Sequence, residues 1–186
     1  MSEEENKAHW SLFLAGNHEA YSWLYNKYVQ VLYRYGQHLT SDGEMIKDCI
    51  QEVFANLYRS RKSLPTPANV KVYLIVSLKN SLLRRMHRES VYDRNKDAHS
   101  GGFLLEPGVE ERFIDDESQR AVEEKIVRLL AVLTPRQREI MYYRYIQEME
   151  FEEICSVMEL SYQSAQNLIQ RSMKRIRESF GRGRSD

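Results

Sequence analysis

A run of amides, hydroxyls and cations between residues 162 and 175 has the chemistry needed to contact DNA. Amide and guanidinium groups can form hydrogen bonds with base edges in the major groove, and lysine and arginine neutralise phosphates. These side chains share one face of a helix expected to begin at Ser161, and they are Tyr162, Gln163, Ser164, Gln166, Asn167, Gln170, Arg171, Lys174 and Arg175. The residue types on this face therefore predict a DNA-binding surface.

Two short helices joined by a tight turn are expected to present this face. Phe151, Ile154 and Met158 repeat at intervals of three or four residues, which is typical of a helix with one buried side. The serine at 161 is a good N-cap for a second helix, whose buried side is expected to hold Ala165, Leu168, Ile169 and Ile176. The pattern favours a helix-turn-helix, although a helical hairpin with a solvated charged face would look similar.

Three further segments carry a resemblance to a known family. KDCIQEVFANLY at 47–58 resembles the polymerase-binding signature of bacterial RNA polymerase sigma factors, and TPRQREIMYYRY at 134–145 resembles the entry to their upstream-element-binding domain. YLIVSLKNSLLRRMHR at 73–88 lies between them in the expected order. The match covers roughly residues 10–90 and 120–180 and resembles the short extracytoplasmic-function (ECF) class. It implies a factor that binds core RNA polymerase and directs promoter recognition, promoter melting and transcription initiation.

The resemblance assigns roles to two further surfaces, besides upstream-element binding by the face at 162–174. Its polymerase-binding residues are Asp48, Gln51, Glu52 and Phe54, beside Asn56 on one helix edge. Its downstream-element residues are Lys62, Ser63 and Leu64 in a base-holding loop, then Lys71, Tyr73, Ser77, Lys79, Asn80, Arg84 and Arg85. A solvated helix edge is the alternative for the first set. Core packing is as good an explanation for Tyr73 as base capture.

Two positions depart from the family pattern. Glu159 and Leu160 stand where the family usually has a glycine before the hydrophobic residue of the turn, so a non-glycine residue must fit there. Gln166 stands where a basic residue is common, which leaves the promoter sequence undefined.

Helical apolar spacing extends over most of the chain, and no segment shows strand alternation. Helices are expected over about 18–39, from a cap at Asp42 to Leu57, over 70–87 with Leu82 and Leu83 inward, over 122–133, and from a capping box at Thr134. Residues 89–118 lack this periodicity. The predicted fold is all-α, with helical domains at 1–92 and 119–186 joined by a flexible acidic linker at 93–118, and the second domain contains the helix-turn-helix.

Charge is segregated along the chain, although its formal net value is zero. Residues 59–96 hold ten Lys/Arg and two Asp/Glu, residues 97–124 hold two and nine, and residues 171–184 hold six and one. Two basic blocks on either side of an acidic one suggest two nucleic-acid surfaces separated by a segment that duplex DNA repels.

Composition and motifs exclude several other classes. A 186-residue chain with 42% hydrophobic and 29% charged residues is typical of a soluble protein. With no apolar run long enough for a membrane span and an acidic start, MSEEENKAHW, it is expected to be cytoplasmic. Cys49 and Cys155 are expected to be reduced core residues, and the histidines are scattered.

We therefore expect no enzyme, metal, cofactor or small-molecule substrate, but core RNA polymerase, promoter DNA and an anti-sigma factor as partners. A stand-alone helix-turn-helix regulator and a helical adaptor protein are the alternatives from other classes. Copurification with core polymerase would separate the sigma factor from both.

Overall fold

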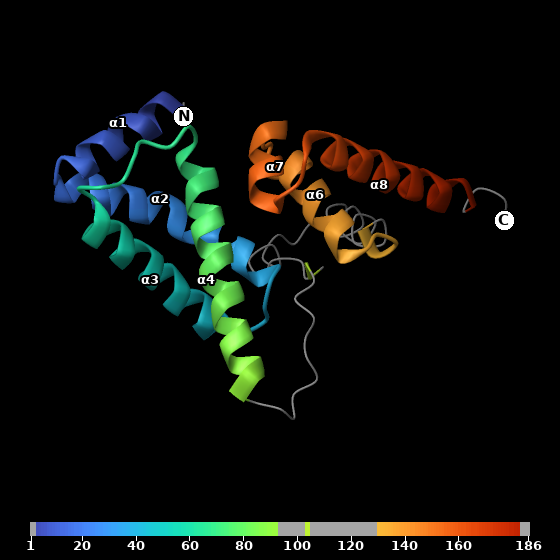
Figure 1. Cartoon of the computed structure of the whole chain (residues 1–186), viewed down its shortest axis with the longest axis horizontal. Helices are drawn as coiled ribbons and strands as arrows, with labels where there is room; N and C mark the ends of the chain where they lie inside the picture. Colours follow the sequence, from blue (N-terminus) through green and yellow to red (C-terminus); the bar gives the residue numbers. More distant parts are fainter. Residues whose placement is uncertain (1–2, 93–102, 105–129, 183–186) are drawn as a thin grey trace, which may run out of the picture. The chain divides into compact units, whose positions relative to one another are not determined.

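The computed structural model describes residues 3–92, 103–104 and 130–182, and the regular structure in these ranges is helical (Figure 1). The all-α prediction is confirmed for these residues. The chain divides into two compact units, Met1–Gly101 and Gly102–Asp186. Most of the helix expected over 122–133, and the expected linker apart from Phe103 and Leu104, lie outside the described residues.

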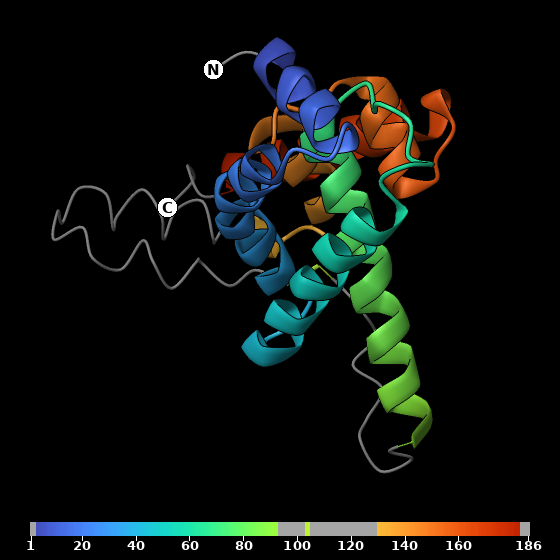
Figure 2. The same cartoon turned by 90° about the vertical axis from the view of Figure 1, so that its left-hand side faces the viewer.

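The first unit is a bundle in which α2, α3 and α4 pack against one another, while α1 packs on α2 and α4 (Figure 2). Its helices are α1 (Glu3–Leu14), α2 (His18–Gln37), α3 (Gly43–Ser60) and α4 (Val70–Tyr92). The apolar stripes expected from the sequence close its core, and their buried members include Leu24, Tyr28, Leu32, Tyr35, Ile46, Ile50, Val53, Ile75, Leu78 and Leu82.

Local sequence determines where these helices begin and how closely they pack. The Asp42 carboxylate accepts a hydrogen bond from the Met45 backbone N–H at 2.9 Å, so the cap expected for α3 is present. A Cβ on Gly36 would lie 2.6 Å from the Ile46 side chain. Because Gly36 has no side chain, α2 and α3 can approach each other at this point.

The short helix α1 was not expected from the sequence. Trp10 and Phe13 are buried at 0% and 1% exposure, and Trp10 Nε1 donates to the Pro65 carbonyl at 3.2 Å. The Glu3 carboxylate accepts the Val70 N–H at 3.0 Å, at the first turn of α4. Helix α1 therefore holds both the connection between α3 and α4 and the start of α4.

The second unit packs α6 (Pro135–Tyr145), α7 (Phe151–Met158) and α8 (Tyr162–Arg182) against one another. The capping box expected at Thr134 is present, because Thr134 N–H donates to Gln137 Oε1 at 3.0 Å and Gln137 N–H donates to Thr134 Oγ1 at 3.3 Å. The buried residues of this unit include Ile140, Tyr143, Ile154, Val157, Ala165 and Leu168.

Several expected core residues are less buried than the sequence suggested, among them Ile169 and Ile176 of α8, which are half-buried. Leu83 is 39% exposed, because it follows the buried Leu82 by one residue, which is a rotation of about 100° around the helix axis. Cys49 is buried as expected, but Cys155 is only half-buried. Among the described helices, none is long and apolar enough to cross a membrane.

Candidate nucleic-acid and polymerase interfaces

The turn between α7 and α8 accommodates a non-glycine residue, as the sequence requires. Glu159 adopts the left-handed conformation, with φ of 52° and ψ of 50°. The Leu160 N–H donates to the Cys155 carbonyl at 2.9 Å, and the Glu159 N–H donates to the Ser156 carbonyl at 3.4 Å. These two bonds make a Schellman motif, which satisfies the last carbonyls of α7. The turn of the helix-turn-helix therefore forms without glycine.

Helix α8 is fixed at its start and along its buried face. Ser161 Oγ accepts the Ser164 N–H at 3.2 Å, so the expected cap is present. Ala165 and Ser172 have 0% exposure, and Ser172 Oγ donates to the Leu168 carbonyl at 2.7 Å. The opposite face of α8 consequently points away from α6 and α7.

The structure places the predicted upstream-element residues on this outer face, except Tyr162, whose exposed ring packs against Phe151 of α7. The side chains of Tyr162, Gln163, Ser164, Gln166, Asn167, Gln170, Arg171, Lys174 and Arg175 are all exposed. Gln163 Nε2 donates to Asn167 Oδ1 at 3.1 Å, and Arg171 Nε donates to the Asn167 carbonyl at 3.3 Å. The Tyr162 ring lies 4.7 Å from that of Phe151. Amides near the start of α8 and cations after them thus form one exposed strip.

The predicted polymerase-binding residues divide between the surface and the core. Asp48, Gln51 and Glu52 are exposed on one edge of α3. Phe54 is only 2% exposed, and its ring packs edge-on against Tyr25 at 5.0 Å. The expectation that Phe54 contacts a partner is therefore corrected, since this side chain holds α3 against α2.

The acidic edge of α3 is bonded to α4. Arg85 Nη2 lies 2.9 Å from Asp48 Oδ2, and Ser81 Oγ donates to Glu52 Oε2 at 3.2 Å. The hydrogen bond to Asp48 raises the pKa of Arg85 above its ordinary value. The Asp48 and Arg85 side chains remain 53% and 40% exposed, so the pair stays accessible to other charged groups.

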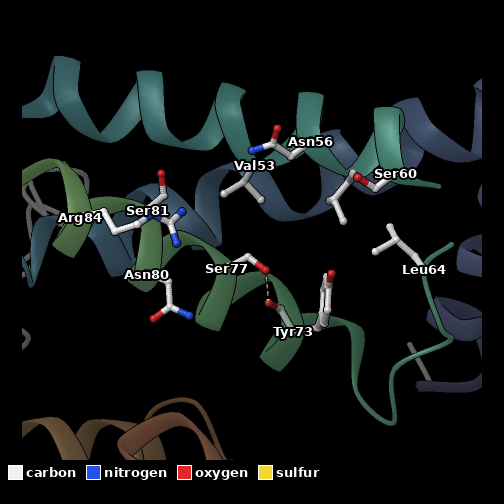
Figure 3. A pocket seen from close by; sticks show the side chains of 10 residues that line it. Val53, Asn56, Ser60, Leu64, Tyr73, Ser77, Asn80, Ser81 and Arg84 are labelled. Atoms are coloured by element: carbon white, nitrogen blue, oxygen red, sulfur yellow. Dashed lines mark hydrogen bonds between the residues drawn. The ribbon is translucent and has the colours of Figure 1, made fainter.

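A pocket of about 260 Å³ lies between α3, α4 and the segment that connects them (Figure 3). Its lining combines carboxamides, hydroxyls, an aromatic ring, a guanidinium and apolar side chains. The lining residues are Val53, Asn56, Leu57, Ser60, Leu64, Tyr73, Ser77, Asn80, Ser81 and Arg84. Such a mixture can hold a flat polar ring by hydrogen bonds and stacking.

Half of the pocket comes from residues that the sequence assigned to the downstream element, namely Leu64, Tyr73, Ser77, Asn80 and Arg84. The Tyr73 ring also packs edge-on against Trp10 at 5.4 Å. Tyr73 therefore both packs in the core and lines the pocket. Lys62 and Ser63 are exposed in the turn after α3, whereas Lys71 and Lys79 are half-buried and do not line the pocket.

The sequence missed the contribution of α3 to this pocket. Asn56 and Ser60 line it from α3, and Ser81 lines it from α4. Val53, Asn56, Leu57 and Ser60 follow helical spacing, so one face of α3 could have been recognised as facing α4. Asn56 was instead expected beside the acidic edge.

Comparison with known proteins gives matches that follow the two units. Residues 24–91 match the Sigma-70 region 2 family, and residues 123–176 match the Sigma-70, region 4 family. The ECF RNA polymerase sigma factor SigM of Bacillus subtilis is 21% identical over 163 residues, which is 88% of this chain and 96% of SigM.

Two solved structures have the same fold. CnrH, solved in complex with the cytosolic domain of CnrY, matches with a TM-score of 0.60 at 14% identity over 95% of this chain and 97% of CnrH. The sigma factor RpoE of Bartonella quintana, solved with the anti-sigma factor NepR, matches with a TM-score of 0.58 at 15% identity over 83% and 92% of the two chains.

A region 2 bundle followed by a region 4 helix-turn-helix defines a sigma factor, a protein that directs transcription initiation. The chain belongs to the ECF class of this family.

Proposed function

We propose that three surfaces of this chain divide the work of initiation. The edge of α3 formed by Asp48, Gln51 and Glu52 docks on core RNA polymerase. The pocket between α3 and α4 captures an unpaired base of the downstream promoter element, and the outer face of α8 binds the duplex upstream element.

The composition of the pocket between α3 and α4 is the observation that supports strand capture. An extruded base needs hydrogen-bonding groups for its edge, a ring for its face and cations for the flanking phosphates. The pocket offers the Asn56 and Asn80 amides, the Tyr73 ring and the Arg84 guanidinium. A stand-alone regulator is not favoured, because it would need neither this pocket nor a region 2 match.

In vitro transcription with core polymerase tests this division. Asn80→Ala removes a pocket amide, so we expect about a fivefold loss of transcripts from duplex promoters, and full recovery on a template melted beforehand. Arg171→Ala removes a phosphate or base contact on α8, so pre-melting should not rescue it. Asn26→Ala, which removes an exposed amide from α2, is the matched control. Equal rescue of both variants, or of neither, would contradict the assignment.

The solved relatives suggest a further class of partner. CnrH and RpoE were each solved with a second protein bound, which for RpoE is an anti-sigma factor. We infer that a protein inhibitor of this kind controls the present chain by competing with core polymerase. Acting on polymerase and DNA, the chain would work in the cytoplasm without catalysis or cofactor.

A further inference from the structure

Phe103 lies in the segment expected to be a linker, yet it is buried in the second unit. Its side chain is 5% exposed, and its ring centroid lies 5.1 Å from that of Tyr142 and 6.5 Å from that of Tyr143. Arg138 Nη1 donates to the Phe103 carbonyl at 2.9 Å. The expectation of a segment without packed residues is therefore wrong at this position.

The contact combines two kinds of interaction on one helix. The aromatic rings of α6 supply apolar area and tilted or edge-on ring packing, and the guanidinium supplies a charge-assisted hydrogen bond to the backbone. Arg138 is itself oriented, because its Nε donates to the Leu133 carbonyl at 3.1 Å. Helix α6 thus binds both the side chain and the main chain of Phe103.

This contact shortens the stretch of chain that can separate the two units. From Tyr92, the last residue of α4, to Leu130 there are 38 peptide links, which span at most about 137 Å when fully extended. From Tyr92 to Phe103 there are 11 links, which span at most about 40 Å in any conformation. While Phe103 is bound to α6, the shorter limit applies.

We propose that Phe103 is a positioning residue that sets which spacings between the two promoter elements this factor accepts. The inference rests on the proposed function, in which the first unit binds the downstream element and α8 binds the upstream one. Tethering raises the effective concentration of the second contact only at separations the tether can span. While Phe103 is bound to α6, the length of residues 93–102, and not that of the whole connecting segment, limits the separation that the tether can span.

Insertions on either side of Phe103, which we call the anchor because it is bound to α6, test this without replacing any residue. Six Gly/Ser residues inserted between Lys96 and Asp97 lengthen the tether by on the order of 20 Å, the rise of about six base pairs. The same insertion between Gly108 and Val109 lengthens only the chain beyond the anchor. Transcription with core polymerase is measured on promoters whose spacer is lengthened one base pair at a time.

We expect the insertion before the anchor to raise activity on lengthened spacers, relative to the optimal spacer, by about threefold or more. The insertion after the anchor should leave the spacer profile unchanged. Combining the insertion after the anchor with Phe103→Ser should broaden the dependence of activity on spacer length, because the anchor is then lost. Equal profiles for the two insertions in the unsubstituted chain would overturn the proposal.

A second measurement examines the anchor in the free full-length protein. Phe103→Ser should speed backbone hydrogen exchange in α6 by about tenfold or more, because a buried ring is lost, whereas Phe103→Leu should largely preserve protection. Tyr145→Ser is the control, since it removes a 54% exposed ring from the same helix. Unchanged exchange in Phe103→Ser would overturn the anchor. If the unsubstituted chain started no transcript at any spacing, the proposed function and the role of Phe103 in spacing would both be overturned. The hydrogen-exchange data would still show whether Phe103 is bound to α6.

Discussion

Asp48 and Arg85 join the surface proposed to bind polymerase to the helix proposed to bind DNA. Their 2.9 Å contact is about half exposed, and exposed ion pairs contribute at most about 1 kcal/mol, so competing charges can replace either partner. A basic polymerase surface that takes Asp48 would leave Arg85 with its longer, exposed contact to Glu89 at 3.7 Å, and so make it more available to a phosphate. One exchange of partners would then connect docking to DNA binding.

This coupling predicts that Asp48→Asn raises the affinity of the free chain for a single-stranded downstream oligonucleotide by about two- to fivefold, because Arg85 loses its shorter ion pair and keeps the longer one to Glu89 at 3.7 Å. The same variant should bind immobilised core polymerase more weakly. Fluorescence anisotropy at low salt measures the first effect. Gln51→Ala, on the same edge, should leave oligonucleotide affinity unchanged. A gain that persists in the Asp48→Asn/Arg85→Ala double variant would rule out Arg85 as its source.

Glu159 and Glu148 share an uncommon backbone conformation, since each has φ of 52°. The left-handed region costs a residue with a Cβ about 1–2 kcal/mol, and glycine avoids that cost while losing part of the gain to chain entropy. The helix-turn-helix of this chain therefore forms with strain at the position where the family usually has glycine.

Glu159→Gly should consequently stabilise the second unit by about 0.5–1 kcal/mol. Hydrogen exchange of α7 and α8 in the full-length chain measures the gain in protection. Glu148→Gly should have a similar effect near the α6–α7 turn. Glu152→Gly, in the first turn of α7, should instead cost up to about 1 kcal/mol, because glycine has low helix propensity and the substitution removes a negative charge near the helix N-terminus. A loss of protection in Glu159→Gly would show that Glu159 contributes a contact that outweighs its strain.

At the level of elements, α1 supports the pocket from behind. Trp10 packs edge-on against Tyr73, which lines the pocket, and it holds the α3–α4 connection through the Pro65 carbonyl. The Glu3 carboxylate adds a bond at the first turn of α4. A helix with no proposed contact of its own thus positions residues that are proposed to hold DNA.

Trp10→Ala should therefore destabilise the first unit by about 3–5 kcal/mol, because it leaves a cavity under the pocket. Trp23, the other tryptophan of the chain, reports the unfolding of this unit in urea by its fluorescence. Leu12→Ala on the same helix removes a 49% exposed side chain and should change stability by less than about 0.5 kcal/mol. Comparable losses for the two variants would mean that α1 does not pack as described.

Helical periodicity predicted the elements well but not their neighbours. Caps such as Asp42 and Thr134 are local, so the sequence located them correctly. Helix α1 was not predicted, because Trp10 and Phe13 are the only large apolar residues on its buried side. Phe54 was expected at a partner surface but is buried against α2, since a single helix pattern does not show which helix covers each face. The outer face of α8 was easier to predict, because none of the described helices of the second unit packs over its polar side.

For the whole molecule, the separation of charge predicts that promoter binding requires polymerase. Residues 97–124 carry a net charge of −7, from two basic and nine acidic residues, between basic blocks of +8 at 59–96 and +5 at 171–184. Whatever their conformation, tethered acids compete with phosphates for the same cations. We expect core polymerase to relieve this competition and to combine two weak DNA contacts into one strong one.

The last prediction removes part of that acidic charge. Glu110→Gln with Glu111→Gln should raise the affinity of the free chain for duplex upstream DNA by about two- to threefold. Glu4→Gln with Glu19→Gln is the control, because it removes the same charge from exposed positions on α1 and α2, and its effect should be smaller. The difference should shrink as salt rises, because screening shortens the reach of the competing charges. Fluorescence anisotropy on one labelled duplex across a salt series decides it. Tight, sequence-specific binding by the unsubstituted chain without polymerase would refute this autoinhibition and favour a regulator that acts alone.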